Sequence, residues 1–195
     1  MASNTTTTTT NTAAPMPVVT CGAHEAVGKA VIAGLKPEYE VILFCQGATA
    51  LAKELPLLLS SPATFTPESS TIGSGNFSSP PRAVIFGGAW GPEDIAQVQG
   101  ALAAAAASGG GGGGGGAEAT TIGQLLDELV ILRNDTGIKP APVTQPDGTV
   151  VPVVPGSPEY SEHVTGRVRA ALGKLASEGK GALAKVEGSN GVYWY

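Results

Sequence analysis

Short apolar runs alternate with segments of helical periodicity along most of the 195-residue chain, and this alternation restricts the fold more than any other feature. Strand-like runs occupy residues 17–21, 40–45, 83–86 and 129–132. In the second run, residues 41–45 are all apolar, as expected of a parallel strand covered on both faces. Strands that alternate with helices form βαβ units with right-handed crossovers. We therefore predict an α/β fold, a three-layer sandwich with a mostly parallel sheet of about four to five strands.

Helices are predicted between and after these runs. Helical periodicity is found in 27–35, 48–55, 92–107, 122–129 and 161–177. Pro92, followed by two acidic residues, is typical of a helix start, and Thr120 or Thr121 is placed to cap the next helix. Pro146-Asp147-Gly148 predicts the turn of a small hairpin within 144–154.

Three segments are predicted to lie outside the core. Residues 1–16 form a Thr-rich leader that we expect to be disordered, because its apolar content is too low to offset backbone ordering. A flexible connector is predicted at 108–118, where the glycine run lacks the Lys of a phosphate-binding loop. The Ser-, Thr- and Pro-rich stretch 60–81 is expected to be a long, flexible surface loop, either a lid or an insertion. Residues 17–195 are predicted to form one domain.

Charge and composition argue against several function classes. The net charge is −5 and the 11 Lys and Arg residues are scattered, so we expect no nucleic-acid partner. No apolar run approaches the roughly 20 residues of a membrane helix, and the start of the chain resembles neither a secretory signal nor a transit peptide. We therefore expect no membrane partner and a cytoplasmic location. Cys21 and Cys45 are expected to be reduced thiols, and without Cys and His at zinc spacing no metal is expected.

The most informative segment is Val18-Val-Thr-Cys-Gly22-Ala-His-Glu-Ala-Val-Gly28-Lys. It resembles the opening of the short-chain dehydrogenase and NmrA-like families of the NAD(P)-binding Rossmann-fold superfamily, whose first turn reads TGATGxxG before an amphipathic helix. In that alignment Gly22 and Gly28 take the places of the first and third glycines, and Glu25 takes the place of the second. Leu132-Arg133-Asn134-Asp135 is similar to the LRP that follows a later strand in NmrA-like proteins. The resemblance implies a Rossmann-like domain over 17–195.

The same resemblance implies NAD or NADP as the ligand. In this fingerprint the first glycine makes the tight turn, the second admits the pyrophosphate and the third allows close helix packing. Glu25 would therefore bring bulk and negative charge to the phosphate position. Gln46, at the end of the second strand, could bond a ribose hydroxyl, but it is neutral and does not select between NAD and NADP. The implied cofactor-binding residues are Gly22, His24, Glu25, Val27, Gly28, Gln46, Gly87 and Gly88.

Catalytic residues are not identified by the sequence. Short-chain dehydrogenases use a Tyr-x-x-x-Lys pair, in which the Lys lowers the tyrosine pKa. Here Tyr160 is followed four residues later by Val164, and Tyr39 by Leu43. The two histidines, His24 and His163, each neighbour a glutamate, and solvent-exposed positions explain both. If the chain is an enzyme, the resemblance implies an NAD(P)-dependent oxidoreductase.

Three functions therefore stay open. The first is a small Rossmann-like protein that binds NAD(P), another nucleotide or a similar small molecule. The second is a non-catalytic regulatory or interaction domain that keeps the fold without a cofactor, as Glu25 and the missing Tyr-Lys pair suggest. The third is a flavodoxin-like scaffold that acts through a homo-oligomer interface. The aromatic residues 193–195 are expected to pack on the domain, the alternatives being a ligand wall or a dimer contact.

Overall fold

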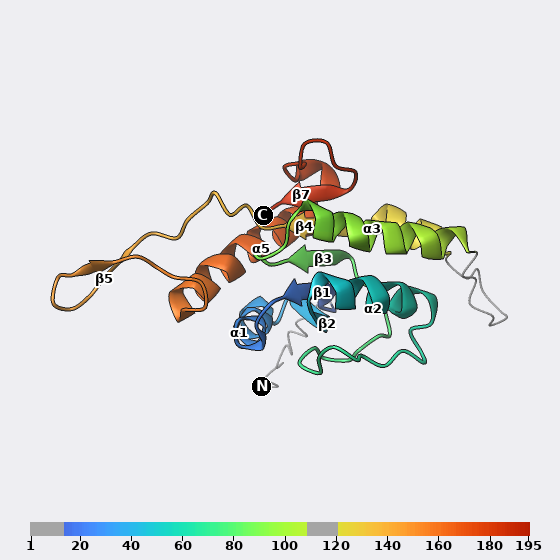
Figure 1. Cartoon of the computed structure of the whole chain (residues 1–195), viewed down its shortest axis with the longest axis horizontal. Coiled ribbons are helices and arrows are strands. Elements are labelled where there is room, and N and C mark those ends of the chain that lie inside the picture. Colours follow the sequence, from blue (N-terminus) through green and yellow to red (C-terminus); the bar gives the residue numbers. More distant parts are fainter. Residues whose placement is uncertain (1–13, 109–120) are drawn as a thin grey trace, which may run out of the picture.

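A computed structural model describes residues 14–108 and 121–195, and within them five parallel strands form the central sheet (Figure 1). The strands are β1 (Met16–Gly22), β2 (Tyr39–Gln46), β3 (Ala83–Phe86), β4 (Val130–Arg133) and β7 (Val192–Trp194). Their order across the sheet is β2-β1-β3-β4-β7, and every neighbouring pair is parallel. The predicted α/β class and the parallel sheet are confirmed.

Helices cover both faces of this sheet and complete three layers. One face carries α1 (Glu25–Leu35) and α5 (Pro158–Glu178), and the other carries α2 (Ala48–Ser60), α3 (Pro92–Ala107) and α4 (Ile122–Glu128). A short 3-10 helix, η1 (Lys180–Ala182), follows α5. Each face of the sheet has its own hydrophobic core. Successive residues of β1 point to opposite faces, so Val18 packs toward α1 and α5 whereas Val19 packs toward α2 and α3. None of the described helices combines the length and apolar character that crossing a bilayer requires.

The strand order places a topological switch point between β1 and β3. Strand β2 follows β1 in the chain and lies next to it at one edge of the sheet. The later strands β3, β4 and β7 lie in turn on the other side of β1. This 2-1-3-4-5 order is that of flavodoxin-like doubly wound sheets, whereas dinucleotide-binding sheets have the order 3-2-1-4-5-6. Ligands of such open sheets bind beyond the carboxyl ends of the strands at the switch point.

One crossover departs from the uniform right hand predicted for the chain. The connection from β1 to β2 and the connection from β4 to β7 cross the sheet in opposite directions, yet their helices, α1 and α5, lie side by side on one face. The β4–α5–β7 connection therefore has the opposite hand to the other three. This path is longer than an ordinary βαβ crossover, since the hairpin of β5 (Val143–Thr144) and β6 (Val150–Val151) precedes α5 and extends away from the sheet (Figure 1).

The predicted leader and the second predicted helix have different bounds in the structure, and most of the predicted connector lies outside the described residues. The leader was predicted to reach residue 16, but Met16 is already the first residue of β1, and residues 1–13 lie outside the described part of the chain. Of the predicted connector 108–118, only Ser108 is among the described residues. Helix α2 continues through Pro56 to Ser60, because burial of Leu58 and Leu59 offsets the hydrogen bond that proline cannot donate.

The long loop 60–81 lies along the outer edge of the sheet. Its backbone N–H groups at Ser74 and Gly75 donate to the carbonyl oxygens of Val41 and Ile42 on β2, at 2.9 and 3.1 Å. These bonds cover part of an edge strand that would otherwise be open to pairing. No residue of the loop lines the cavity described below, so the loop does not occupy the place of a lid over it.

Candidate functional site

A cavity of about 330 Å³ opens at the carboxyl ends of β1 and β3 and runs between the sheet and helices α1 and α5. Its position is the switch point at which open α/β sheets bind ligands. Six of the eight residues predicted to bind a cofactor line it: Gly22, His24, Val27, Gly28, Gly87 and Gly88. The volume lies at the lower end of the range of small-molecule sites, which is roughly 300–1,000 Å³.

Glycines shape the wall beneath the cavity. A methyl group on Gly28 would stand 2.4 Å from Cε2 of Phe44, and one on Gly22 would stand 3.0 Å from the same atom. The first turn of α1 therefore lies directly against the ring of a β2 residue, which is the close helix packing predicted for the third glycine of the fingerprint. The Phe44 ring in turn forms part of the cavity lining.

The turn after β3 is held to the end of β1 by two hydrogen bonds. The Gly87 N–H donates to the Cys21 carbonyl oxygen at 2.9 Å, and Nε1 of Trp90 donates to that same oxygen at 3.2 Å. A methyl group on Gly87 would lie 3.4 Å from this carbonyl oxygen, so a small residue suits the approach. These contacts keep Gly87 and Gly88 at one rim of the cavity.

The lining is mainly apolar, with a few polar groups. Among the described residues that line the cavity, none is Lys, Arg, Asp or Glu. The apolar wall comprises Val27, Val31, Phe44, Ile85, Val164 and Val168, from α1, α5 and the sheet. The polar side chains are those of Thr20, His24, Asn134, Tyr160 and Tyr195. An apolar pocket with a few convergent polar groups is the usual form of a small-molecule site.

Thr20 is the polar group at the sheet itself. Thr20 is 6 % exposed, and its Oγ1 has no hydrogen-bond partner among the described residues. A buried hydroxyl without a partner costs about 1–3 kcal/mol of folding free energy. The neighbouring strand residues are apolar, so this threonine introduces an unused donor and acceptor into an otherwise apolar strand.

Asn134 and Tyr195 form a fixed polar cluster on the β4 side. Nη1 of Arg167 donates to Oδ1 of Asn134 at 3.2 Å, and the same guanidinium donates to the main-chain oxygen of Tyr195. The Tyr195 hydroxyl donates to the Phe86 carbonyl oxygen at 2.9 Å. Burial raises the pKa of Tyr195 above its usual range, although the nearby Arg167 opposes this shift. The cluster therefore holds Asn134, which is 5 % exposed, in one orientation.

The start of α1 faces the mouth of the cavity. His24 is the N-cap residue, and its side chain makes no capping hydrogen bond. The first intrahelical bond is donated by Gly28 to the His24 carbonyl oxygen at 3.0 Å. The N–H groups that precede Gly28 in the first turn of α1 have no acceptor within the helix. Together with the helix dipole they favour an anion at the start of α1.

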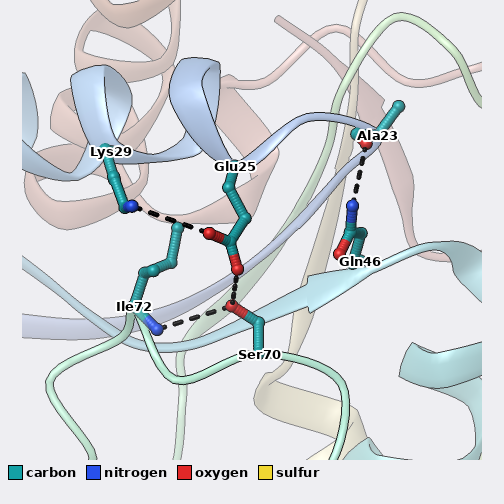
Figure 2. Close-up of polar contacts among 6 residues, drawn as sticks. All are labelled: Ala23, Glu25, Lys29, Gln46, Ser70 and Ile72. Carbon is teal, nitrogen blue, oxygen red and sulfur yellow. Dashed lines mark hydrogen bonds and ion pairs between the residues drawn. The ribbon is translucent and has the colours of Figure 1, made fainter.

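Glu25 and Gln46, the other two predicted residues, do not line the cavity, and Figure 2 shows the polar contacts that they make instead. The Glu25 carboxylate accepts a hydrogen bond from Ser70 Oγ at 3.2 Å and lies 3.6 Å from Nζ of Lys29. Nε2 of Gln46 donates to the Ala23 carbonyl oxygen at 3.4 Å. Glu25 thus fastens the loop 60–81 to α1, and Gln46 ties β2 to the turn after β1.

Arg133 and Asp135 lie at a second, more polar cavity of about 360 Å³ beside the first. The Arg133 guanidinium stands 4.9 Å from the centre of the Trp194 ring, and Oδ1 of Asp135 accepts a hydrogen bond from the Gly137 N–H at 2.9 Å. Stacking and loop capping therefore account for these two side chains. Three carboxylates, from Glu93, Asp94 and Asp135, surround the single guanidinium, which disfavours an anion there.

The histidines and cysteines are not brought together as a catalytic group. His163 is half-buried with Nε2 unpartnered, contrary to the exposed position predicted for it, and it does not line the cavity. Cys21 and Cys45 are paired in register on β1 and β2, and both are buried free thiols as predicted. Burial raises the pKa of Cys21 to about 12. Within 14–108 and 121–195, no cluster of three or more His, Cys, Asp or Glu side chains is arranged to hold a metal.

Sequence reasoning identified the glycine-rich rim but not the interior of the cavity. Val164 and Val168 belong to the predicted helix 161–177, and they line the cavity together with Tyr160, which precedes that predicted range. Thr20 could have been found, because it is a polar residue within an apolar strand on the same face as Val18.

Comparisons of the chain with protein-family models, with curated protein sequences and with solved structures found no match.

Proposed function

We propose that this chain binds a nucleotide in the cavity between β1, β3, α1 and α5, with NAD and NADP as the first candidates. The proposal rests on one observation: six of the residues predicted to bind a cofactor line the cavity at the switch point of the parallel sheet. The apolar interior suits a planar ring, and the uncapped start of α1 suits a phosphate at the mouth.

The strand order widens the set of candidate ligands. Flavodoxin-like sheets bind FMN at their β1/β3 switch point, and this chain has its cavity at the corresponding place. The volume also suits a mononucleotide or one half of a dinucleotide better than a whole dinucleotide. FMN and AMP therefore belong in the same test as NAD and NADP.

The test is a thermal-shift titration with NAD, NADP, FMN and AMP. A ligand that binds only the folded state stabilises it by about 2.7 kcal/mol at a concentration one hundred times its Kd. We expect at least one nucleotide to raise the Tm of the wild-type chain at millimolar concentration. No shift with any of the four would overturn the proposal.

A matched pair of variants locates the binding. Gly88→Leu places a side chain at the rim of the cavity, beside Tyr160 and Asn134, and is expected to abolish the shift. Gly181→Leu introduces the same side chain where a Cβ meets no atom within 4 Å, and is expected to retain the shift. Glu25→Gln is also expected to retain it, because that carboxylate lies outside the cavity.

The second candidate function is a non-catalytic regulatory or interaction domain that keeps the fold without a cofactor. It is favoured by Val164, which stands where a short-chain dehydrogenase would carry the Lys partner of Tyr160, and by the uncharged lining. This second candidate predicts no thermal shift with any of the four nucleotides. A partner protein recovered with the wild-type chain and lost with Gly88→Leu would favour recognition through the same rim.

A further inference from the structure

We propose that the hairpin arm, residues 137–156, closes over the mouth of the cavity and becomes the outer wall of the ligand site. The arm contains β5 and β6 and connects the end of β4 with the start of α5. In this structure it extends away from the sheet and leaves the mouth open (Figure 1). The proposal rests on the proposed function, because it concerns access to the same cavity.

Both ends of the arm lie at the cavity. Asn134, just before the arm, and Pro155 and Gly156, at its far end, are among the residues that line it. Helices α1 and α5 pack together on one face of the sheet, and both begin beyond the carboxyl ends of strands, where the mouth lies. A rotation of the arm about its two ends therefore changes the mouth directly.

A glycine stands at each end of the arm. Gly156 has a φ of 95°, in the left-handed region that favours glycine, and Gly137 is the first residue of the arm. Lids usually move through backbone changes at a few such positions. Between them, Pro140, Pro142 and Pro152 restrict the backbone. We therefore expect the arm to move as one unit about its ends.

The apolar side chains of the arm have no cover. Among the described residues, four large apolar side chains are strongly exposed, and three of them belong to the arm: Ile138 at 51 %, Val150 at 62 % and Val154 at 56 %. The arm carries one positive residue, Lys139, and one negative residue, Asp147. An apolar arm without net charge suits the mainly apolar cavity, because closure removes apolar surface from water.

The backbone edges of the hairpin are poorly suited to pairing with a second copy of the chain. The Gln145 N–H donates to the Thr149 carbonyl oxygen at 2.7 Å, so these two residues direct their backbone groups into the hairpin. Alternation then directs those of Pro142 and Pro152 outward, and proline has no N–H to donate. Such prolines protect an edge from strand addition. The exposed side chains are therefore assigned to the cavity of the same chain.

The arm is long enough to cross the mouth. From Gly156 back to Val150 the chain spans up to about 20 Å when extended. Packed helices are about 8–10 Å apart, so this part of the arm reaches from the start of α5 to the first turn of α1. Ala26, in that turn, is exposed. Closure brings Val150 to the side of Ala26 and excludes water from the cavity.

Disulfide trapping in the full chain tests the closure. Val150→Cys is combined with Ala26→Cys, and the matched control combines it with Ala96→Cys, an exposed alanine of α3 on the opposite face of the sheet. Copper-phenanthroline and dioxygen oxidise the introduced thiols, whereas Cys21 and Cys45 are buried. Mass spectrometry and gel mobility under non-reducing conditions identify the product. We expect a disulfide within one chain to form at least about tenfold faster with Ala26→Cys than with Ala96→Cys, because closure brings only the first pair together.

The trapping is repeated with NAD, NADP, FMN and AMP. A nucleotide that raises the Tm is expected to accelerate trapping at least about threefold, because a ligand that contacts the arm favours the closed state. Equal rates for the two pairs, or disulfides formed only between chains, would overturn the proposal.

The same data separate this proposal from the proposed function. If a nucleotide raises the Tm but leaves the trapping rate unchanged, the closure fails and nucleotide binding stands. If the disulfide forms within the chain as described and no nucleotide raises the Tm, the closure stands and the nucleotide function fails.

Discussion

Thr20 shows how a single buried hydroxyl can be unfavourable for folding. Its buried hydroxyl lacks a protein partner, so the folded chain bears the cost of removing it from water. We predict that Thr20→Val raises the free energy of unfolding by about 1 kcal/mol, because valine has the same shape without the polar atom. Urea denaturation of the ligand-free chain measures this change. A decrease in stability would show that the hydroxyl has a structural role.

The paired thiols of Cys21 and Cys45 make stability depend on alkaline pH. Burial raises the pKa of Cys21 from 9.0 to about 12, and it raises the pKa of Cys45 as well. Because the unfolded chain loses these protons first, the folded state is favoured below pH 9 and loses that advantage as the pH rises through the folded pKa.

We therefore predict that the free energy of unfolding falls between pH 8 and about 10.5 by about 1–2 kcal/mol for each thiol. The comparison is with a Cys21→Ala, Cys45→Ala variant, in which this part of the pH dependence should be absent. Urea denaturation at both pH values supplies the measurement. Equal slopes for the two proteins would contradict the assignment.

At the scale of elements, the loop 60–81 approaches the backbone of β2 closely at Gly73. A methyl group on Gly73 would stand 2.7 Å from the Ile42 carbonyl oxygen and 3.0 Å from Cα of Leu43, both backbone atoms of the strand. Phe65 and Phe77 pack edge to face within the loop, with ring centres 5.0 Å apart. The loop is thus docked by its own backbone and by an internal aromatic pair.

Gly73→Ala is predicted to lower the free energy of unfolding by about 1–3 kcal/mol, the usual cost of overpacking. Gly100→Ala, within α3 and with no atom within 4 Å of the added Cβ, is predicted to raise it by about 1 kcal/mol through helix propensity. Chemical denaturation of both variants tests the pair. Similar effects in the two would show that the loop does not depend on this contact.

Local patterns predicted most elements but not the pairings made over long distances. The strands at β1, β2, β3 and β4 have strong apolar runs, and the hairpin of β5 and β6 has a Pro-Asp-Gly turn; all five predictions are confirmed. Strand β7, Val-Tyr-Trp, consists of residues that favour strands, but three residues are too few to predict one, and its pairing with β4 is not encoded locally. The side-chain direction of Glu25 was likewise not predictable, because its partner Ser70 lies 45 residues away.

On the scale of the whole molecule, the unusual path of α5 completes the cavity. With the same hand as the other crossovers, α5 would lie on the face of α2 and α3, and the α1 face would lose the wall formed by Tyr160 and Val164. The long connection between β4 and α5 permits the opposite hand and brings Asn134, at its start, into the same cavity. The topology therefore assembles one site from elements distant in sequence.

The most direct measurement is a crystal structure of the full chain with the nucleotide that gives the largest thermal shift. Our account predicts ligand density between α1 and α5, with a planar ring against Phe44. Density elsewhere, for example in the separate cavity beside Lys180 and Lys185, would contradict the account, as would a ring bound away from the carboxyl ends of β1 and β3.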